Sequence, residues 1–320
     1  MKQPSIVAVV VTHNRLAKLR LTLARLIGQP IDHILVFDNA STDGTKEWLL
    51  GQASANLTVT LSAENLGGAG GFAAAMREAR DIHDPDWLVV MDDDGRPAEG
   101  AIAEFLAMDL TKWDAIGAAV FHPDGRICEM NRPYRNPFWR GREFLRTLAG
   151  KGRGGFHLSD DAYVPTSQTV EVDMASFVGL FVSRAALTDT DLPDPRLFIY
   201  GDDQIFTLNL RKKGFRLGFA PAVRFEHDTD AQQGETGLVL RPMWKVYYNY
   251  RNALIAYRVA AGWLFWPLVP LLLVKWHRKA RDYGEDAKVF RQLLGGAVRD
   301  GLSHALDRSH TEVVSMSTRN

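Results

Sequence analysis

The sequence predicts an α/β protein with a mostly parallel sheet covered by helices on both faces. Short, continuous apolar runs, as expected of strands buried on both faces, alternate with segments in which apolar residues recur at helical spacing. Each of the first four runs is followed by a polar or glycine-rich cluster. In such a sheet ligands bind beyond the carboxyl ends of the strands, so we expect the functional site among these clusters.

The first third of the chain contains four predicted strands with helices between them. The expected strands are 6–11, 33–37, 57–61 and 87–91. Leucines at helical spacing predict a helix over 15–27. A second helix, with Ser41 or Thr42 as its N-cap, is expected to reach residue 50, and a third covers 70–82.

The second half of the chain is less regular. From about residue 126 to 169 it is rich in Pro, Arg and Gly, which predicts either a mobile, substrate-facing insertion or a solvated linker. Strand-like runs return at 170–184 and 215–225, on either side of a helix expected over 203–213.

Composition limits the classes of function. The chain has 320 residues, of which 46% are hydrophobic and 24% charged, enough to bury a sizeable core. Since 38 Lys and Arg balance 38 Asp and Glu, no overall charge favours a nucleic-acid partner, and none is expected. The single cysteine, Cys128, fits a reducing compartment. The first apolar run is too short for a signal peptide, so a cytoplasmic location is expected.

Three consecutive carboxylates, Asp92, Asp93 and Asp94, follow the fourth predicted strand directly. Crowded like charges are costly unless a cation neutralises them, and oxygen ligands suit Mg²⁺ or Mn²⁺. We therefore predict a divalent-metal site here, with a solvated acidic turn as the alternative. His227, between two carboxylates at the end of a later strand, is a candidate third ligand.

The glycine-rich segment 65–72 precedes a predicted helix, where free backbone N–H groups can meet an anion or a sugar ring closely. A plain tight turn is the alternative. The segment follows the third strand and lacks G-x-G-x-x-G spacing, which argues against a dinucleotide-dependent oxidoreductase.

Asp202 and Asp203 follow an aromatic run and precede the helix expected over 203–213. Carboxylates at a helix start can serve as caps. They can also supply a general base for a substrate hydroxyl. A hydrolase would use two cooperating carboxylates and an activated water, whereas the polar clusters on the early strands favour group transfer from a nucleotide.

Together these segments resemble those of inverting family 2 glycosyltransferases of the GT-A fold. The segments are VVVTHNR at 9–15, FDNASTDG at 37–44, NLGGAGGF at 65–72, DDD at 92–94 and GDD at 201–203. The resemblance covers about residues 5–255 and implies a Rossmann-like sheet. The NLGGAGGF element is most similar to bacterial galactofuranosyltransferases and related rhamnosyltransferases of cell-surface glycan synthesis.

The resemblance implies roles for individual residues. Those expected around the nucleotide base and ribose are Thr12, Asn14, Arg15 and Asp38. Those expected near the nucleotide and donor sugar are Asn65, Gly67, Gly68, Asp92 and Asp93. The expected metal ligands are Asp92, Asp94 and His227. Asp203 matches the catalytic base, with Asp202 as the alternative because many relatives have Trp-Glu-Asp where this chain has Gly-Asp-Asp.

The implied activity is metal-dependent, inverting transfer of a sugar to a hydroxyl of a glycan or lipid-linked acceptor in cell-surface polysaccharide synthesis, such as that of an O-antigen. The donor is expected to be UDP-galactofuranose, with dTDP-rhamnose as the alternative. A rival of another class is a non-catalytic nucleotide-sugar-binding or assembly protein at the membrane.

The chain is expected to divide into a catalytic domain, 1–240, and a helical extension, 241–320. Within the first, 1–125 would bind the nucleotide sugar and 126–240 the acceptor.

The helical extension is basic in its first half, because residues 241–281 include eight Lys and Arg and no Asp or Glu. The uncharged stretch 259–274 is shorter than the ~20 residues of a spanning helix, and its Trp and basic flanks suit the interface of an anionic bilayer. We therefore expect a peripheral protein on the cytoplasmic face of the inner membrane. The alternative is a helix pair packed on the catalytic unit or on a second subunit of an oligomer.

Overall fold

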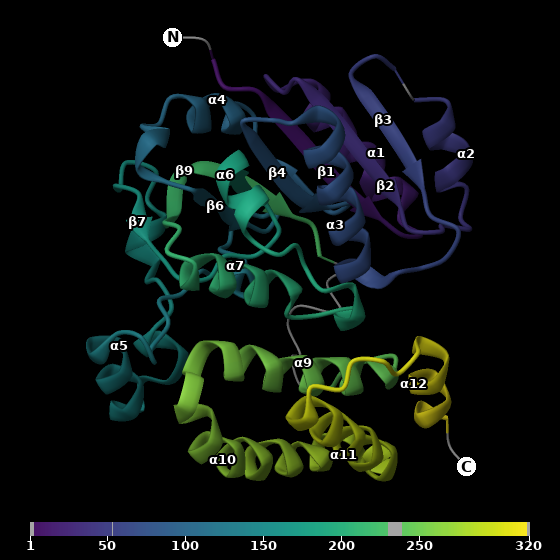
Figure 1. The fold of residues 1–320 in the computed structure, drawn as a ribbon, viewed down its shortest axis with the longest axis vertical. Coiled ribbons are helices and arrows are strands. Elements are labelled where there is room, and N and C mark those ends of the chain that lie inside the picture. Colours follow the sequence, from purple (N-terminus) through teal and green to yellow (C-terminus); the bar gives the residue numbers. More distant parts are fainter. Residues whose placement is uncertain (1–2, 53, 230–238, 319–320) are drawn as a thin grey trace.

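The computed structural model describes residues 3–52, 54–229 and 239–318. Its single sheet contains β1 (Ile6–Thr12), β2 (His33–Asp38), β3 (Leu57–Leu61), β4 (Trp87–Asp92), β5 (Gly95–Pro97), β6 (Ala115–Phe121), β7 (Val170–Glu171), β8 (Leu180–Ser183) and β9 (Leu217–His227). The strand order is β3-β2-β1-β4-β8-β6-β9-β5, with β7 paired to β9 (Figure 1).

Helices cover both faces of this sheet. They are α1 (Leu16–Ile27), α2 (Thr45–Leu50), α3 (Gly67–Glu78), α4 (Ala101–Leu106), α6 (Arg184–Asp189) and α7 (Asp202–Lys212). Helix α5 (Gly141–Arg146) lies away from the sheet and packs on the short helical turns that follow it. Because side chains alternate along a strand, β1 contributes to two cores. The core shared with α3, α6 and α7 contains Val7, Val9 and Val11. The core shared with α1 and α4 contains Ile6, Ala8 and Val10.

The predicted fold class is confirmed. β3, β2, β1 and β4 pair in parallel, as the alternation of strands and helices indicates. The second half of the sheet is mixed, because the short strand β8 enters between β4 and β6 and is antiparallel to both. The segment expected to be strand-like over 170–184 therefore contains two short strands, β7 and β8, that pair in different places.

Two predicted helix starts are wrong. Helix α2 begins at Thr45, after Gly44 in a left-handed conformation (φ 89°), and not at a Ser41 or Thr42 cap. Ser41 instead accepts a hydrogen bond from the backbone N–H of Asn14 at 2.9 Å. Helix α3 begins three residues early, at Gly67, so the glycines form its first turn.

The Pro-, Arg- and Gly-rich insertion contains α5 and several short helical turns. Tyr134 and Asn136 are buried within it, and the Asn136 side chain donates a hydrogen bond to the carbonyl of Ala260 at 2.9 Å. A solvated linker does not bury side chains in this way. The insertion is a packed part of the molecule.

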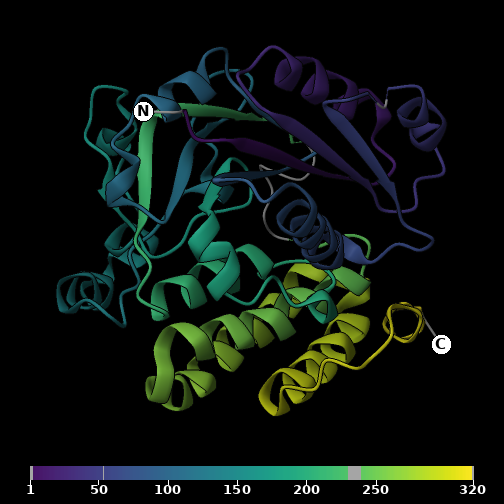
Figure 2. The ribbon, with the colours of Figure 1, turned by 45° about the horizontal axis from the view of Figure 1, so that its top comes forward.

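The C-terminal helices form a separate layer next to α7 (Figure 2). They are α9 (Trp244–Ala261), α10 (Phe265–Arg278), α11 (Ala287–Ser303) and α12 (His310–Ser317). Helix α9 packs between α7 and α11, and α9, α10, α11 and α12 share a third hydrophobic core. Helix α10 lies on the outer side of this layer, at the bottom of Figure 1.

Candidate active site

A cavity of about 580 Å³ opens at the carboxyl ends of β1, β2 and β4, where the polar clusters of the sequence gather. Its lining includes predicted site residues from five separate segments: Thr12, Arg15, Asn65, Gly67, Gly68, Asp92, Asp93, Asp94, Asp202, Asp203 and His227. Asn14 and Asp38 lie outside this lining. Asn14 accepts a hydrogen bond from the N–H of Thr42 at 2.6 Å, and Asp38 accepts one from Ser41 at 3.1 Å, so both brace the neighbouring loop.

At the end of β4, Asp93 and Asp94 are buried and Asp92 is half-buried. The hydroxyl of Thr12 donates to Asp93 at 2.8 Å, and the Arg15 guanidinium contacts both Asp93 and Asp94. Burial, with the charges of its acidic neighbours added, raises the pKa of Asp92 well above its ordinary value. Burial and the charge of Asp94 raise the pKa of Asp93 to about 7. Arg15 therefore only partly compensates the negative charge gathered here.

His227 reaches this triplet because β5 pairs antiparallel with β9, which sets Gly95 opposite His227. Nε2 of His227 lies 3.3 Å from a carboxylate oxygen of Asp94. Nδ1 lies 2.7 Å from the side-chain oxygen of Asn131, whose amide donates to Ser176 at 2.8 Å. Burial alone would raise the pKa of Asp94, but the hydrogen bond and charge of His227 lower it below its ordinary value.

The donor set of Asp94 and His227 fits a divalent cation. Asn131 can hold Nδ1 as a hydrogen-bond donor, which is the usual support of a metal-binding imidazole, and a cation on Nε2 and Asp94 would replace the hydrogen bond between these two groups. Within the described residues, no group of three or more His, Cys, Asp and Glu side chains is arranged to hold a metal by itself. Mg²⁺ sites commonly use one or two carboxylates and complete the shell with substrate phosphates, so a site here would need the donor phosphates as further ligands.

The first turn of α3 is fixed by hydrogen bonds between strand-end loops. The Asn39 amide donates to the carbonyl of Gly67 at 2.9 Å, and its oxygen accepts from the N–H of Leu66 at 2.8 Å. Gly67 has a φ of +72°, and a Cβ there would lie 2.2 Å from the carbonyl oxygen of Phe198. A Cβ on Gly68 would have no heavy atom within 4 Å, so this position is open toward the cavity.

The loop before α7 holds three residues with positive φ within four positions: Phe198 (φ 64°), Tyr200 (φ 71°) and Gly201 (φ 76°). Such a conformation is unfavourable for aromatic residues and needs support from outside the loop. That support comes from α9. The buried Asn252 amide donates to the carbonyls of Leu197, Ile199 and Tyr200 at 2.8–2.9 Å.

Arg251, the neighbour of Asn252 on α9, extends this support. Its side chain is fully buried, and one guanidinium nitrogen donates to the carbonyls of Arg196 and Leu197 at 2.8 and 3.0 Å. The guanidinium also stacks over the rings of Tyr247 and Tyr248.

Asp202 and Asp203 start α7 and face the same cavity. Asp202 is buried, and its charge reaches Asp92 on β4. Asp203 is half-buried and accepts a hydrogen bond from the N–H of Gln204 at 2.6 Å. Burial raises the pKa of both carboxyls, that of Asp203 to about 6, so Asp203 can exchange a proton near neutral pH.

Sequence reasoning missed several residues that line the cavity: His13, Asn39, Asn131, Trp244 and His310. His13 and Asn39 stand next to predicted residues in the same strand-end clusters, so their position in those clusters could have identified them. Trp244 and His310 come from α9 and α12, and no motif in the sequence marks them. The His310 ring stacks on Phe198 with ring centres 4.2 Å apart, so α12 also contacts the loop before α7.

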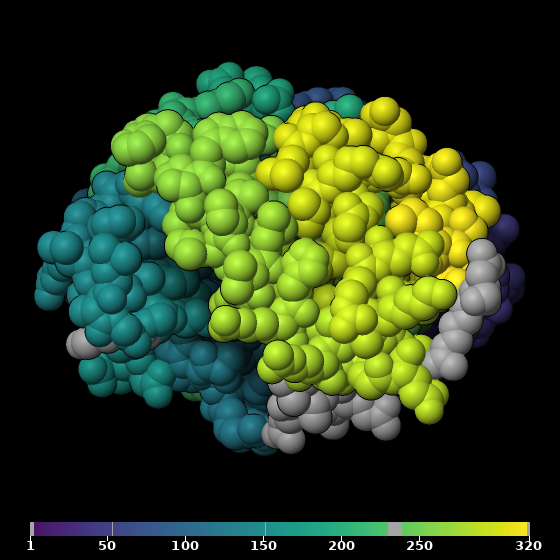
Figure 3. Space-filling model, turned by 90° about the horizontal axis from the view of Figure 1, so that it is seen from below, coloured from purple at the N-terminus to yellow at the C-terminus, as the bar shows by residue number. Residues whose placement is uncertain are grey.

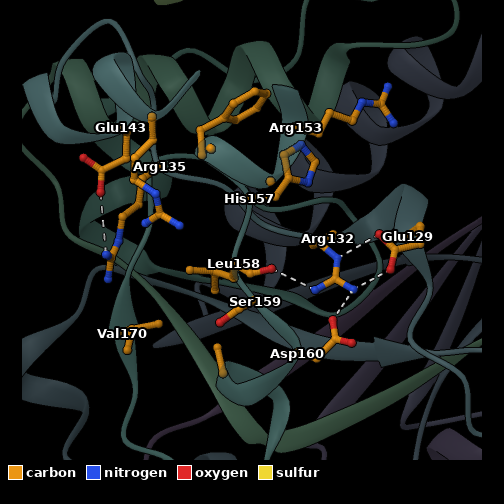
Figure 4. Close-up of a pocket in the computed structure, with 15 residues that line it drawn as sticks. Glu129, Arg132, Arg135, Glu143, Arg153, His157, Leu158, Ser159, Asp160 and Val170 are labelled. Atoms are coloured by element: carbon orange, nitrogen blue, oxygen red, sulfur yellow. Dashed lines mark hydrogen bonds and ion pairs between the residues drawn. The ribbon is translucent and has the colours of Figure 1, made fainter. Parts of the chain in front are cut away.

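A second cavity, of about 610 Å³, lies in the insertion (Figure 4). Arg132 pairs there with Glu129 and Asp160, and Arg135 lies 3.8 Å from Glu143. The predicted site residues, all of which the structure describes, lie outside its lining. Tyr134 links this cavity to α7, because its ring stacks on His157 and its hydroxyl accepts a hydrogen bond from the Gln204 side chain at 2.5 Å.

The fold and the site define a glycosyltransferase of the GT-A type, and comparison with known proteins agrees. The model of the family "Glycosyl transferase family 2" matches residues 7–161. Galactofuranosyltransferase GlfT1 of Mycobacterium tuberculosis is 33% identical over 268 residues, which cover 78% of this chain and 80% of the relative. The chain belongs to glycosyl transferase family 2.

Solved structures share the fold. GalNAc-T7 with UDP, GalNAc and Mn²⁺ superposes with a TM-score of 0.57 at 15% identity, over 80% of this chain and 48% of that one. Mannosyltransferase PcManGT from Pyrobaculum calidifontis, in complex with GDP-Man and Mn²⁺, gives a TM-score of 0.51 at 16% identity, over 99% and 79% of the two chains.

Proposed function

We propose that this glycosyltransferase moves galactofuranose from UDP-galactofuranose, with inversion, to a hydroxyl of a glycan or lipid-linked acceptor in cell-surface polysaccharide synthesis. The observation that carries the proposal is the similarity to GlfT1, which covers 78% of this chain and so extends beyond the stretch 7–161 that the general family model matches. The open cavity with its acidic triplet and paired Asp202 and Asp203 supports catalysis rather than a scaffold role.

In this proposal the donor diphosphate lies beside Asp94 and His227, which would hold Mn²⁺ or Mg²⁺. The metal-bound complexes of GalNAc-T7 and PcManGT support this assignment. When bound, the cation would supply positive charge to the departing nucleoside diphosphate. Arg15, already beside Asp93 and Asp94, adds a second positive charge on the same side of the cavity.

The sugar is proposed to lie over the first turn of α3. Gly68 leaves room for a ring to approach the backbone, and the free N–H groups of a helix start favour an anionic neighbour. Asn65 and Thr12 line the same cavity, and the Asn65 amide can donate to the nucleotide or the sugar.

Asp203 is proposed as the general base. It is the less buried of the two carboxylates, so an acceptor hydroxyl can reach it, whereas Asp202 is buried and its charge acts on Asp92. The proton of the acceptor hydroxyl passes to Asp203 while the oxygen bonds to the anomeric carbon and the bond to the diphosphate breaks. Attack from the face opposite the leaving group inverts the anomeric centre.

The test is a donor panel of UDP-galactofuranose, dTDP-rhamnose, UDP-galactopyranose and GDP-mannose, each with Mn²⁺, with Mg²⁺ or with chelator. The readouts are nucleoside diphosphate release and thermal shift. Turnover of UDP-galactofuranose alone is the expected result. Turnover of dTDP-rhamnose instead would replace the proposed donor. Donor binding without turnover on any acceptor tried would favour the assembly-protein alternative.

We also propose that the protein works at the cytoplasmic face of a membrane, where a lipid-linked acceptor would be presented. One helical run, Trp244–Ser303, is apolar and long enough by length and composition to cross a bilayer, which supports membrane contact in general terms.

A further inference from the structure

The outer side of the C-terminal layer is unusually apolar. A surface helix normally turns its apolar stripe to the core and a polar face to water. Helix α10 buries Phe265, Val269 and Trp276, yet its outward side is apolar as well. Four side chains form what we name the C-terminal apolar face: Trp263 (79% exposed), Trp266 (61%), Leu271 (68%) and Val274 (54%).

Burial within the molecule does not account for this composition. In the most apolar 18-residue window of Trp244–Ser303, only 28% of the residues are buried. A core helix of a soluble protein would bury most of such a window. Within the part of the chain that the structure describes, the C-terminal apolar face is left uncovered, as is typical of a surface that meets a partner.

The geometry of α10 does not suit a membrane-spanning helix. The chain reverses at Gly262 (φ 57°) and Gly284 (φ 55°), so α9, α10 and α11 are separate helices. With 14 residues, α10 is about 21 Å long, short of the ~30 Å hydrocarbon core of a bilayer. A helix of this length with tryptophans on its outward side suits an orientation in the plane of the interface.

The charges beside the C-terminal apolar face indicate which kind of surface it would contact. The exposed side chains of Lys275, Arg278 and Arg281 follow the apolar face directly and form what we name the basic cluster. The nearest acidic residue along the chain after them is Asp282, and none occurs from residue 241 to 281. An apolar face bordered by cations matches an anionic lipid surface better than another protein copy, whose identical basic cluster would be repelled.

A second apolar projection lies on the same side of the molecule. Leu145 on α5 and Leu148 just after it are 66% and 68% exposed, next to the exposed Arg142 and Arg146. Figure 3, which views the molecule from below, shows the segment of α5 in teal and the C-terminal helices in light green to yellow on one broad surface. Two contacts far apart in the sequence would set the orientation of the protein on a membrane.

We propose that the C-terminal apolar face and the basic cluster dock the protein on an anionic bilayer, with α10 parallel to the membrane plane and α5 as a second contact. This surface is distinct from the candidate active site, so the docking stands whichever donor sugar the enzyme uses.

The experiment is co-sedimentation of the full chain with vesicles of phosphatidylcholine, with or without phosphatidylglycerol. The first variant replaces Trp263, Trp266, Leu271 and Val274 by Ser. The second replaces Lys275, Arg278 and Arg281 by Ser. The control replaces Leu21 and Ile27 by Ser, two equally exposed apolar residues of α1, on the far side of the sheet from α10.

Wild type and control are expected to bind only the vesicles with phosphatidylglycerol. The basic-cluster variant should bind these vesicles about a hundredfold more weakly. Each cation near such a surface increases the binding constant by up to about tenfold, and the variant loses three cations. The apolar variant should lose binding, and brominated lipid should quench tryptophan fluorescence in wild type but not in this variant.

Three outcomes would overturn the proposal: wild type that does not sediment with anionic vesicles, variants that sediment like wild type, or wild type that is a dimer in solution and becomes a monomer in the apolar variant. UDP release with a soluble acceptor is measured in parallel. Variants that lose vesicle binding should keep this activity, which separates a failure of docking from a failure of the proposed function.

Discussion

The side-chain amide of Asn252 donates a hydrogen bond to the main-chain carbonyl of Tyr200 at 2.9 Å. Tyr200 has a positive φ and stands two residues before Asp202, whereas Asn252 belongs to a helix that begins more than forty residues later in the chain. The conformation that aims Asp202 and Asp203 into the cavity is thus held by the C-terminal layer.

Replacing this support should impair both stability and catalysis. Asn252→Ala leaves buried carbonyls without a donor, so we expect a loss of about 1–3 kcal/mol in the free energy of unfolding. Displacement of the loop should lower kcat by about tenfold to a hundredfold with little change in KM for the donor. The control Ser183→Ala removes the N-cap of α6, at a cost of about 1 kcal/mol, and should leave kcat unchanged. Equal kcat values in the two variants would contradict the positioning role.

Substitution of Asp203 and of Asp202 should affect the rate of sugar transfer to different extents. Asp203→Asn should lower transfer by about a hundredfold to ten-thousandfold while UDP-sugar binding, measured by calorimetry, stays within a small factor of wild type. Asp202→Asn, isosteric and next to it, should have a much smaller effect. A larger loss in Asp202→Asn would exchange the two roles.

The pH dependence of transfer should reflect the raised pKa of Asp203. Burial raises this pKa to about 6, and a base works only when it is deprotonated. kcat/KM should therefore rise with pH from about 5 to 7 and level off above the pKa, and activity should be lost as the pH falls through it. The rising limb should be missing from the residual activity of Asp203→Asn. A limb centred near an ordinary carboxyl pKa would argue against a buried base.

Gly67 and Gly68 provide a matched pair of substitutions. Gly68→Ala adds a methyl group that meets no protein atom, so the fold should keep its stability while donor affinity falls by about tenfold. Gly67→Ala instead forces a Cβ into the carbonyl of Phe198 at a positive φ, so it should lower the melting temperature sharply. Thermal unfolding with and without UDP-galactofuranose separates the two effects. Unchanged donor affinity in Gly68→Ala would place the sugar elsewhere.

Asn131 should influence metal affinity without touching the metal. It holds Nδ1 of His227, and loss of such a support typically weakens metal binding by about tenfold to a hundredfold. Mn²⁺ titration of Asn131→Ala, followed by calorimetry and by activity, tests this. Ser176→Ala leaves the bond between Asn131 and His227 in place and should show a smaller change. Wild-type Mn²⁺ affinity in Asn131→Ala would remove His227 from the proposed ligands.

The parallel half of the sheet was predictable because each strand is a continuous apolar run with a helix after it. The gathering of Thr12, Asn65 and Asp92–Asp94 followed from this, since parallel strands end at one edge. The antiparallel strand β8 was not predictable, because four residues are too few to show a period.

Other parts of the site depend on contacts distant in the sequence. His227 reaches Asp94 through pairing with β5, a strand of only three residues that carries no local pattern. Asn252, Trp244 and His310 lie on helices whose sequence shows an apolar face and no motif. Their roles depend on where those helices pack, which local sequence does not specify.

Because α9 supports the loop before α7 through hydrogen bonds, the smallest active fragment of the enzyme would have to include α9. A chain cut after residue 240 would retain every carboxylate of the candidate active site and lose both side chains, Arg251 and Asn252, that shape the loop presenting two of them. Because α9 continues through a short turn into α10, the helix that steadies the catalytic machinery and the helix proposed to rest on lipid are consecutive parts of one scaffold. Exchange of the C-terminal helices between relatives would therefore alter the turnover rate as well as the localisation in the cell.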